Sequence, residues 1–387
     1  NQYMSRANYA NCDEIYGVVR EILGRSPGIS ISAAVREGCE RLNIEFHERI
    51  RKSVNQRLVR AQQGKKEVLV NEDFLRAQGR TYDKRKKTFI ITYAQNATPV
   101  HEGLWENILA YSKSLNANLH VIAGRYKNQT SIWSSKQESD EWWSKEVKLY
   151  LDAGRHNIHE YLQVLSDVKI QPTASTPLSG LNGITGEESC IIGHPRQHLK
   201  SLPVLEGYKN KLLLSTGACT LANYTDSKAG KKGEFHHMLG FIIVELDGDD
   251  FHIRQVNADD HGNFYDVYHR AKDGEISFNE EGIDTVILGD VHVRHNNKEV
   301  TKATFDFIKK MKPKCIVAHD IAESESILHW DEKDPFRLMQ KSEEGLDDLR
   351  EEIDQIMEWV RSHKDYTTNF VIARSNHDDM IDRWLKS

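Results

Sequence analysis

The chain has 387 residues, enough for two to three average domains, which argues against a single small binding module. With 39% hydrophobic and 28% charged residues, its composition is that of a globular chain with buried cores and excludes collagen-like, disordered and low-complexity proteins. No apolar run approaches the roughly 18 residues that a membrane span requires, and no hydrophobic signal segment opens the chain. We therefore expect a cytoplasmic protein with no membrane partner. The scattered cysteines, never in C-x-x-C spacing, indicate neither a disulfide framework nor a thiolate zinc site.

The net charge of -6 is unevenly distributed along the chain. Residues 1–87 carry 18 Lys and Arg against 11 Asp and Glu, a surplus of +7, so the remaining residues carry -13. A basic segment joined to an acidic body suggests that the segment binds a polyanion. The alternative is an ordinary solvated helical surface.

Within this basic segment, hydrophobic spacing predicts helices near residues 13–23, 30–42 and 45–61, followed by a hairpin near 64–70. The third helix places Ile50, Val54 and Leu58 on one face and basic residues on the others. This pattern resembles a small winged helix-turn-helix domain over residues 1–87, with DNA as the expected partner; a structural or oligomerising role is the alternative. The expected DNA contacts are Arg49, Lys52, Arg57, Lys65 and Lys66.

From residue 88 the pattern changes to strand, helix and strand. Apolar strands at 89–91 and 119–124 flank a helix near 101–114, and strands at 285–289 and 315–318 flank a helix near 300–311. Short apolar runs separated by amphipathic helices are typical of parallel strands covered on both faces. We therefore predict an α/β fold with two layered sheet domains in tandem.

Polar side chains follow three apolar strands at 285–289, 315–318 and 370–373. Carboxyl ends of parallel strands meet at one edge of a sheet, so these side chains should converge. Carboxylate and imidazole groups suit divalent ions such as Mn, Fe, Mg or Zn, and a shared carboxylate can hold two ions. The side chains are Asp290 and His292, then Asp320, then Asn376, His377 and Asp378.

The order G-D-x-H, Asp, N-H-D resembles the calcineurin-like metallophosphoesterase superfamily, which includes phosphatases, cyclic-nucleotide phosphodiesterases and repair nucleases. The resemblance implies two divalent ions, manganese above all, with Mg, Fe or Zn as alternatives. It implies that Asp290 and His292 bind the first ion, Asp320 bridges both, and Asn376 binds the second. It further implies that His377 is the acid on the phosphate side and that Asp378 orients or tunes it.

The chain departs from the family pattern at several positions. His319 stands where the family usually has Gly, Ser375 replaces the Gly of G-N-H, and Glu323 matches an acidic or amide residue three after the bridge. The family pattern continues with a further His and a G-H-x-H strand end, for which residues 281–387 have no counterpart. Either the chain is a fragment or the remaining ligands come from elsewhere.

Residues 88–280 resemble a complete but degenerate copy of the same domain. Their opening half has Tyr93, Gln95 and Arg125 in the places of Asp290, His292 and Asp320, and residues 190–246 resemble the closing half. We therefore expect a ligand-free domain at 88–280 and the ligand-bearing first half of a second domain at 281–387. The alternative is a hybrid site in trans that uses histidines of the first copy, namely His194, His198, His236 or His237.

Two further segments carry predictions. Residues 129–166 are interpreted as a mostly helical insertion, with Trp133, Trp142 and Trp143 as packing anchors. Residues 343–363 predict one long amphipathic helix that would cover the sheet or pair with another subunit in a homo-oligomer.

The functional hypothesis is a metal-dependent phosphodiesterase, most specifically a DNA nuclease. A phosphatase acting on protein or small-molecule phosphoesters is one alternative, and a non-enzymatic DNA-binding or assembly protein is the other. The layout is also similar to an early host-DNA-degrading nuclease of a T-odd coliphage, which would place the protein in the host cytoplasm.

Overall fold

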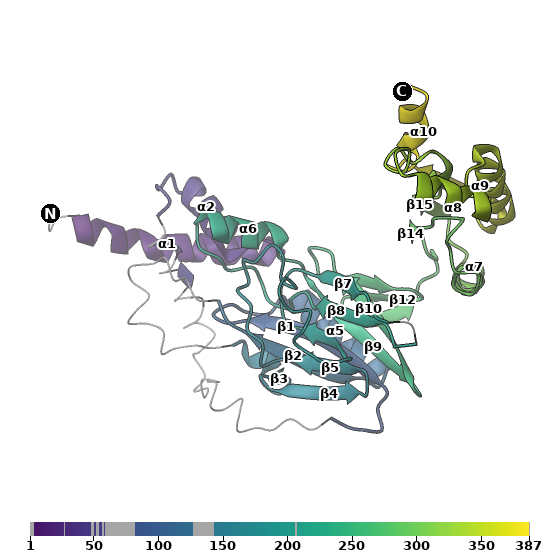
Figure 1. The fold of residues 1–387 in the computed structure, drawn as a ribbon. Coiled ribbons are helices and arrows are strands. Elements are labelled where there is room, and N and C mark those ends of the chain that lie inside the picture. The colour runs from purple at the N-terminus through teal and green to yellow at the C-terminus, as the bar shows by residue number, and fades with distance from the viewer. Residues whose placement is uncertain are drawn as a thin grey trace. The chain divides into compact units, whose positions relative to one another are not determined.

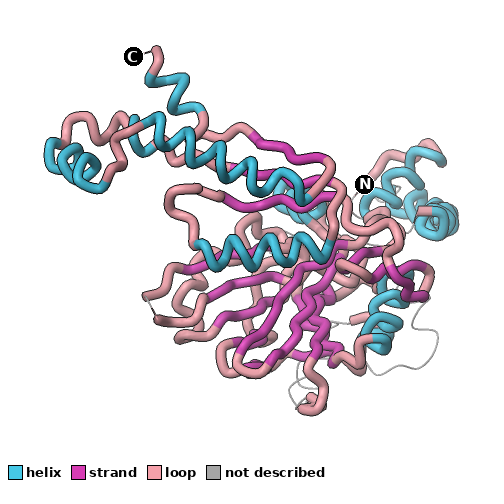
Figure 2. The backbone as a smooth tube through the Cα atoms, turned by 90° about the vertical axis from the view of Figure 1, so that its right-hand side faces the viewer, coloured by secondary structure: helices cyan, strands magenta, loops and turns pink. Residues whose placement is uncertain are grey.

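The computed structural model describes residues 4–26, 28–47, 50–51, 54–55, 58, 82–126, 143–205 and 207–386. The chain divides into two compact units, residues 1–277 and 278–387. Both units combine helices and strands, which confirms the predicted α/β class (Figure 2). The N-terminal helices fall within unit 1 together with the sheets that follow them.

The N-terminal helices pack on one another around a shared apolar core. Helices α1 (Met4–Arg25) and α2 (Ile31–Arg41) are joined by a turn, and the Ser30 hydroxyl caps α2 by accepting the Ala33 N–H at 3.1 Å. Residues 50–51, 54–55 and 58 are also helical. Ile50 and Val54 are buried against both helices, as expected. The predicted hairpin and the five expected DNA contacts, Arg49, Lys52, Arg57, Lys65 and Lys66, lie outside the described residues.

Unit 1 is built on two five-stranded sheets (Figure 1). Their facing sides share one apolar cluster that joins Phe89, Ile91 and Ile122 of the first sheet to Leu162 and Leu214 of the second. The first sheet has the order β10 (Asp250–Asn257), β9 (Gly240–Asp247), β1 (Thr88–Gln95), β2 (Asn118–Gly124), β3 (Leu151–Asp152). The second has the order β4 (Arg155–His159), β5 (Leu162–Leu165), β6 (Ser189–Ile192), β8 (Lys211–Ser215), β7 (His198–Leu202).

The outer face of the first sheet is covered by α5 (Glu102–Ser114), which buries Leu104, Ile108 and Tyr111. β1 precedes this helix in the chain and β2 follows it, and the two strands pair in parallel, as the sequence predicted. A small sheet also packs there, formed by β11 (Phe264–Asp266), β12 (His269–Lys272) and β13 (Glu275–Phe278). The remaining described helix of this unit that is longer than one turn is α6 (Lys228–His236).

The prediction of a mostly helical insertion at 129–166 is wrong for the part that the structure describes. After one 3-10 turn, η2 (Lys145–Val147), the chain forms β3, β4 and β5. Leu162, Val164 and Leu165 are buried in the contact between the two sheets or beneath the second, a role that the helical interpretation missed. Trp143 is a packing anchor as expected, because its buried Nε1–H donates to the carbonyls of Ala94 (3.1 Å) and Gly124 (3.2 Å).

Unit 2 contains the second predicted strand–helix–strand arrangement. Strands β14 (Thr285–Asp290), β15 (Cys315–His319) and β16 (Asn369–Ala373) form a parallel sheet in that order. Helix α7 (Lys298–Met311) connects the first two strands and packs Phe305 and Ile308 onto the sheet. The other helical segments are η3 (Glu325–Ile327), α8 (Pro335–Glu344), α9 (Leu349–His363), η4 (Lys364–Tyr366) and α10 (Asp379–Trp384).

The predicted helix over residues 343–363 is in fact divided. Gly345 adopts a left-handed φ of 70° and ends α8, and the Asp348 carboxylate then caps α9 by accepting the N–H groups of Arg350 and Glu351. A glycine in this conformation followed by an aspartate cap is a helix stop and a new start. The amphipathic spacing continues across the break, which is why it suggested one helix.

Candidate metal centre

The three strand ends of unit 2 meet at one edge, as predicted. Asp290 pairs with His319 between β14 and β15, and His319 pairs with Ala373 between β15 and β16. The loops that carry the remaining candidate residues leave the sheet directly after these positions. The strand pairing therefore places the candidate residues of three chain segments side by side.

Two backbone hydrogen bonds join the first two loops. The His292 N–H donates to the Asp320 carbonyl at 2.9 Å, and the Val293 N–H donates to the Ile321 carbonyl at 3.1 Å. His292 and Asp320 both have a left-handed φ, 43° and 50°, which costs a non-glycine residue about 1 kcal/mol. The cross-loop bonds hold both residues in this conformation, and backbone strain of this kind is concentrated at functional sites.

Two groups of potential metal ligands share Asp320. One ligand atom from each of His292, Asp320 and His377 lies within 4.8 Å of the others, and the same holds for Asp290, His319 and Asp320. Asp320 is 5% exposed, and its Oδ1 is buried without a hydrogen-bond partner among the described residues. Burying an unpartnered carboxylate oxygen is costly, and a bound cation would compensate for that cost. The residues therefore fit a divalent-cation site.

Glu323 contacts both histidines of the first group. Its Oε2 lies 2.6 Å from His292 Nδ1, and its carbonyl oxygen lies 3.1 Å from His377 Nδ1. Since a carbonyl only accepts, we assign the ring proton of His377 to Nδ1, which leaves the Nε2 lone pair available. The two imidazole rings stand nearly perpendicular, with centroids 5.0 Å apart.

The third loop is held mainly by its own side chains. The Asp378 carboxylate accepts from the Ser375 N–H and hydroxyl, both at 3.0 Å, and the Ser324 hydroxyl donates to the His377 carbonyl at 2.9 Å. Asp378 therefore shapes the loop that carries His377, through Ser375. Asn376 is exposed on the same loop.

Charged side chains that the sequence did not single out support the loop after β15. Glu352 of α9, only 1% exposed, accepts the N–H groups of Glu325 and Ser326, each at 3.2 Å. Lys341 of α8 donates to the Glu325 carbonyl at 2.6 Å and pairs with Asp331 at 2.6 Å. Sequence reasoning missed these residues because they act from helices that are distant in the chain.

Unit 1 carries the corresponding strand pair with different residues at its end. Gln95 pairs with Gly124 there, as Asp290 pairs with His319 in unit 2, so Gln95 corresponds to Asp290. Ala97, with a φ of 57°, then corresponds to His292. The pairing at the strand end therefore matches Asp290 with Gln95 and not with Tyr93, the residue that the sequence spacing indicated. β14 contains a register shift between Ile287 and Asp290 that the spacing does not show.

Two of the histidines considered for a site in trans have both ring nitrogens occupied. His194 accepts the Arg196 N–H through Nδ1 (3.0 Å) and contacts the Gln171 carbonyl through Nε2 (3.2 Å). His237 contacts the Tyr224 hydroxyl through Nδ1 and the Thr220 carbonyl through Nε2, both at 2.8 Å. Burial lowers the pKa of His194 to about 4, so it is neutral at physiological pH. Neither ring retains a free lone pair for a metal.

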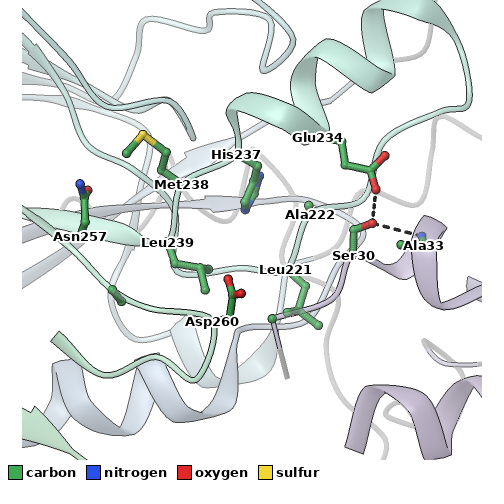
Figure 3. A pocket seen from close by; sticks show the side chains of 12 residues that line it. Ser30, Ala33, Leu221, Ala222, Glu234, His237, Met238, Leu239, Asn257 and Asp260 are labelled. Atoms are coloured by element: carbon green, nitrogen blue, oxygen red, sulfur yellow. Dashed lines mark hydrogen bonds between the residues drawn. The ribbon is translucent and has the colours of Figure 1, made fainter. Parts of the chain in front are cut away.

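Unit 1 also has a cavity of about 440 Å³ between α2, the end of α6 and the loop after β10 (Figure 3). Its polar lining includes Glu234, His237, Asp260 and the Ser30 hydroxyl, which donates to the Glu234 carboxylate. None of the described residues that line it is Lys or Arg, so an anionic phosphate would find no positive charge there.

The fold therefore defines a mixed α/β protein with a candidate divalent-cation site at a parallel strand edge. No protein-family model matches the chain. The chain is similar to Protein A1 of Escherichia phage T5, with 27% identity over 313 residues. The match covers 78% of this chain and 56% of that protein, so the chain spans little more than half the length of this relative. In the described part of the chain, no helix has the length and apolar character needed to cross a membrane.

Proposed function

We propose that the protein is a metal-dependent phosphodiesterase, most specifically a DNA nuclease. The observation that carries this proposal is the pair of His and Asp groups that share the buried Asp320. Two ligand groups joined by one carboxylate are the arrangement that two-metal hydrolysis of phosphate esters requires. The order of these residues along the chain resembles the metallophosphoesterase pattern.

The proposed roles follow the ligand order. The two groups of ligand atoms separate Asp290 from His292, so the assignment of both residues to one ion follows the residue order alone. Asp290 and His292 would hold one ion, Asp320 would bridge, and Asn376 would hold the second, with manganese expected. Bound ions would supply Lewis-acid activation of water and neutralise charge on the phosphate. In its imidazolium form, with a proton on Nε2 as well as on Nδ1, His377 would protonate the leaving oxygen through Nε2, the nitrogen that does not contact Glu323.

The DNA substrate is supported by the surplus of +7 charges in residues 1–87. A polyanion such as DNA needs a basic surface to bind it. The described residues that line the cavity in unit 1 include no Lys or Arg, so the cavity does not provide that surface. The similarity to a phage protein fits an action in the host cytoplasm.

The proposal is tested by the hydrolysis of three substrates by the full chain loaded with Mn²⁺: duplex DNA, bis-nitrophenyl phosphate and nitrophenyl phosphate. We expect the first two to be cleaved and Asp320→Asn to reduce their cleavage at least about a hundredfold. Asp354→Asn, an exposed carboxylate on α9, is the matched control and should retain full activity.

Two results would contradict the proposal in different ways. Hydrolysis of nitrophenyl phosphate without cleavage of DNA would indicate a phosphatase. Absence of bound metal together with absence of hydrolysis would indicate a non-enzymatic DNA-binding or assembly protein.

A further inference from the structure

His319 is the last residue of β15 and lies beside the candidate centre, outside the ligand set that the sequence pattern implies. Its Nδ1 lies 3.1 Å from Asp290 Oδ1, and it forms a group with Asp290 and Asp320 whose ligand atoms lie within 4.8 Å of one another. The side chain of Asp290 is 62% exposed and that of His319 is 40% exposed, so both can adjust without repacking the core. Asp320 adds the buried oxygen that lacks a partner among the described residues.

These distances fit ligands of a single ion. Ligand atoms about 2.1 Å from an ion are about 3 Å apart when adjacent and about 4.2 Å apart when opposite. The separation of 3.1 Å between His319 and Asp290 matches an adjacent pair. The widest separation between ligand atoms in the group is at most 4.8 Å. A side-chain movement of less than an ångström shortens it to the roughly 4.2 Å of an opposite pair.

The corresponding position in unit 1 shows that the histidine is not imposed by the fold. Gly124 occupies it there, and a Cβ on Gly124 would overlap the Tyr93 ring. In unit 2 the position is open and carries an imidazole directed at a carboxylate. The two strand pairs therefore differ at this end in the ability to offer a ligand.

We propose that His319 is a metal ligand that acts together with Asp290 and Asp320 on one divalent ion. An imidazole added to two carboxylates shifts the preference of the site from Mg²⁺ toward transition-metal ions such as Mn²⁺, Fe²⁺ or Zn²⁺. This inference rests on the metal centre of the proposed function and is independent of its phosphodiester substrate.

The test measures metal binding to the full chain by titration with Mn²⁺ and Mg²⁺ and by pulsed electron paramagnetic resonance of bound Mn²⁺. We expect His319→Gln and His319→Gly to weaken Mn²⁺ binding about tenfold or more, to change Mg²⁺ binding much less, and to reduce the nitrogen signal of the bound ion. His261→Gln, an exposed histidine of unit 1, is the matched control, and circular dichroism monitors folding.

Each other outcome has a defined meaning. If the variants bind Mn²⁺ with unchanged affinity and an unchanged nitrogen signal, His319 only hydrogen-bonds Asp290 and this inference is overturned, while the proposed function stands. If the wild-type chain binds no Mn²⁺, both are overturned. Weaker Mn²⁺ binding in the variants of a chain that cleaves no phosphodiester would support His319 as a ligand and overturn the proposed function.

Discussion

The geometry of His377 suits two roles, metal ligand and general acid. It belongs to a ligand group with His292 and Asp320, yet the resemblance assigns it to the phosphate side. Its Nδ1 is directed to the Glu323 carbonyl, so Nε2 alone is available either to bind an ion or to transfer a proton. The two roles predict different effects of its removal.

We expect His377→Gln to reduce DNA cleavage by about 10² to 10⁴-fold, the usual contribution of a general acid. The number of Mn²⁺ ions bound and their affinity should remain close to those of the wild type. Parallel measurement of cleavage rates and Mn²⁺ titrations checks this. A loss of Mn²⁺ affinity in proportion to the loss of rate would make His377 a ligand instead.

At the scale of elements, helix α9 holds the loop that carries Asp320 and Glu323. The Glu352 carboxylate accepts two backbone N–H groups at the start of η3 and also the Ser326 hydroxyl at 2.7 Å. Buried N–H groups that lack an acceptor lose their hydrogen bonds to water without compensation. A carboxylate that accepts from them stabilises the fold mainly by removing that cost. The geometry of the loop at the metal centre therefore depends on α9, a helix that comes later in the chain than the loop.

We expect Glu352→Gln to destabilise unit 2 by about 1–3 kcal/mol, because a neutral amide leaves at least one buried donor poorly paired. Hydrogen exchange of the Glu325 and Ser326 amides should accelerate, and Mn²⁺ affinity should fall. Glu358→Gln, an exposed position on the same helix, provides the comparison. Unchanged exchange at both amides would show that Glu352 does not hold the loop.

At the scale of the whole molecule, unit 1 depends on pH through its buried histidines. His194 is fully buried, and burial lowers its pKa to about 4. In the unfolded chain its pKa returns to about 6.5. Unfolding therefore takes up a proton between these values, and the stability present above pH 6.5 is lost as the pH falls toward 4.

This linkage predicts that His194 alone removes on the order of 3 kcal/mol from the unfolding free energy of unit 1 between pH 6.5 and 4. Urea unfolding of wild type and His194→Gln across this range measures the difference in slope. The variant should be less stable at pH 7 but should lose stability less steeply on acidification. Equal slopes would contradict the assignment of a low pKa to this residue.

DNA binding also belongs to this scale, because it depends on the charge of a whole segment. We expect the triple substitution Arg49→Glu, Lys52→Glu and Arg57→Glu to weaken duplex DNA binding and to lower its salt dependence by up to about three counterions. Fluorescence anisotropy over a range of salt concentrations measures both effects. The same reversal at the exposed Lys272, Lys309 and Lys310 should change them much less; equal effects would indicate binding by net charge alone.

Local patterns predicted the strand–helix–strand segments and four of the residues that meet in unit 2. Asp290, His292, Asp320 and His377 could be found because each follows an apolar strand closely, and parallel strand ends converge. The strands over 155–165 were missed because short polar-flanked runs carry little periodicity. Glu352 was missed because its contacts lie 26 and 27 residues away along the chain.

The amino-acid sequence by itself determined the α/β class, the position of the buried strands and the order of the candidate ligands, since these follow from local periodicity and from residues adjacent to strands. Only the tertiary structure decided that Gln95 corresponds to Asp290, that Asp320 keeps a buried oxygen without a described partner, and that His319 lies against Asp290. The physical reason is that strand register and burial arise from contacts between distant segments, which no local pattern contains.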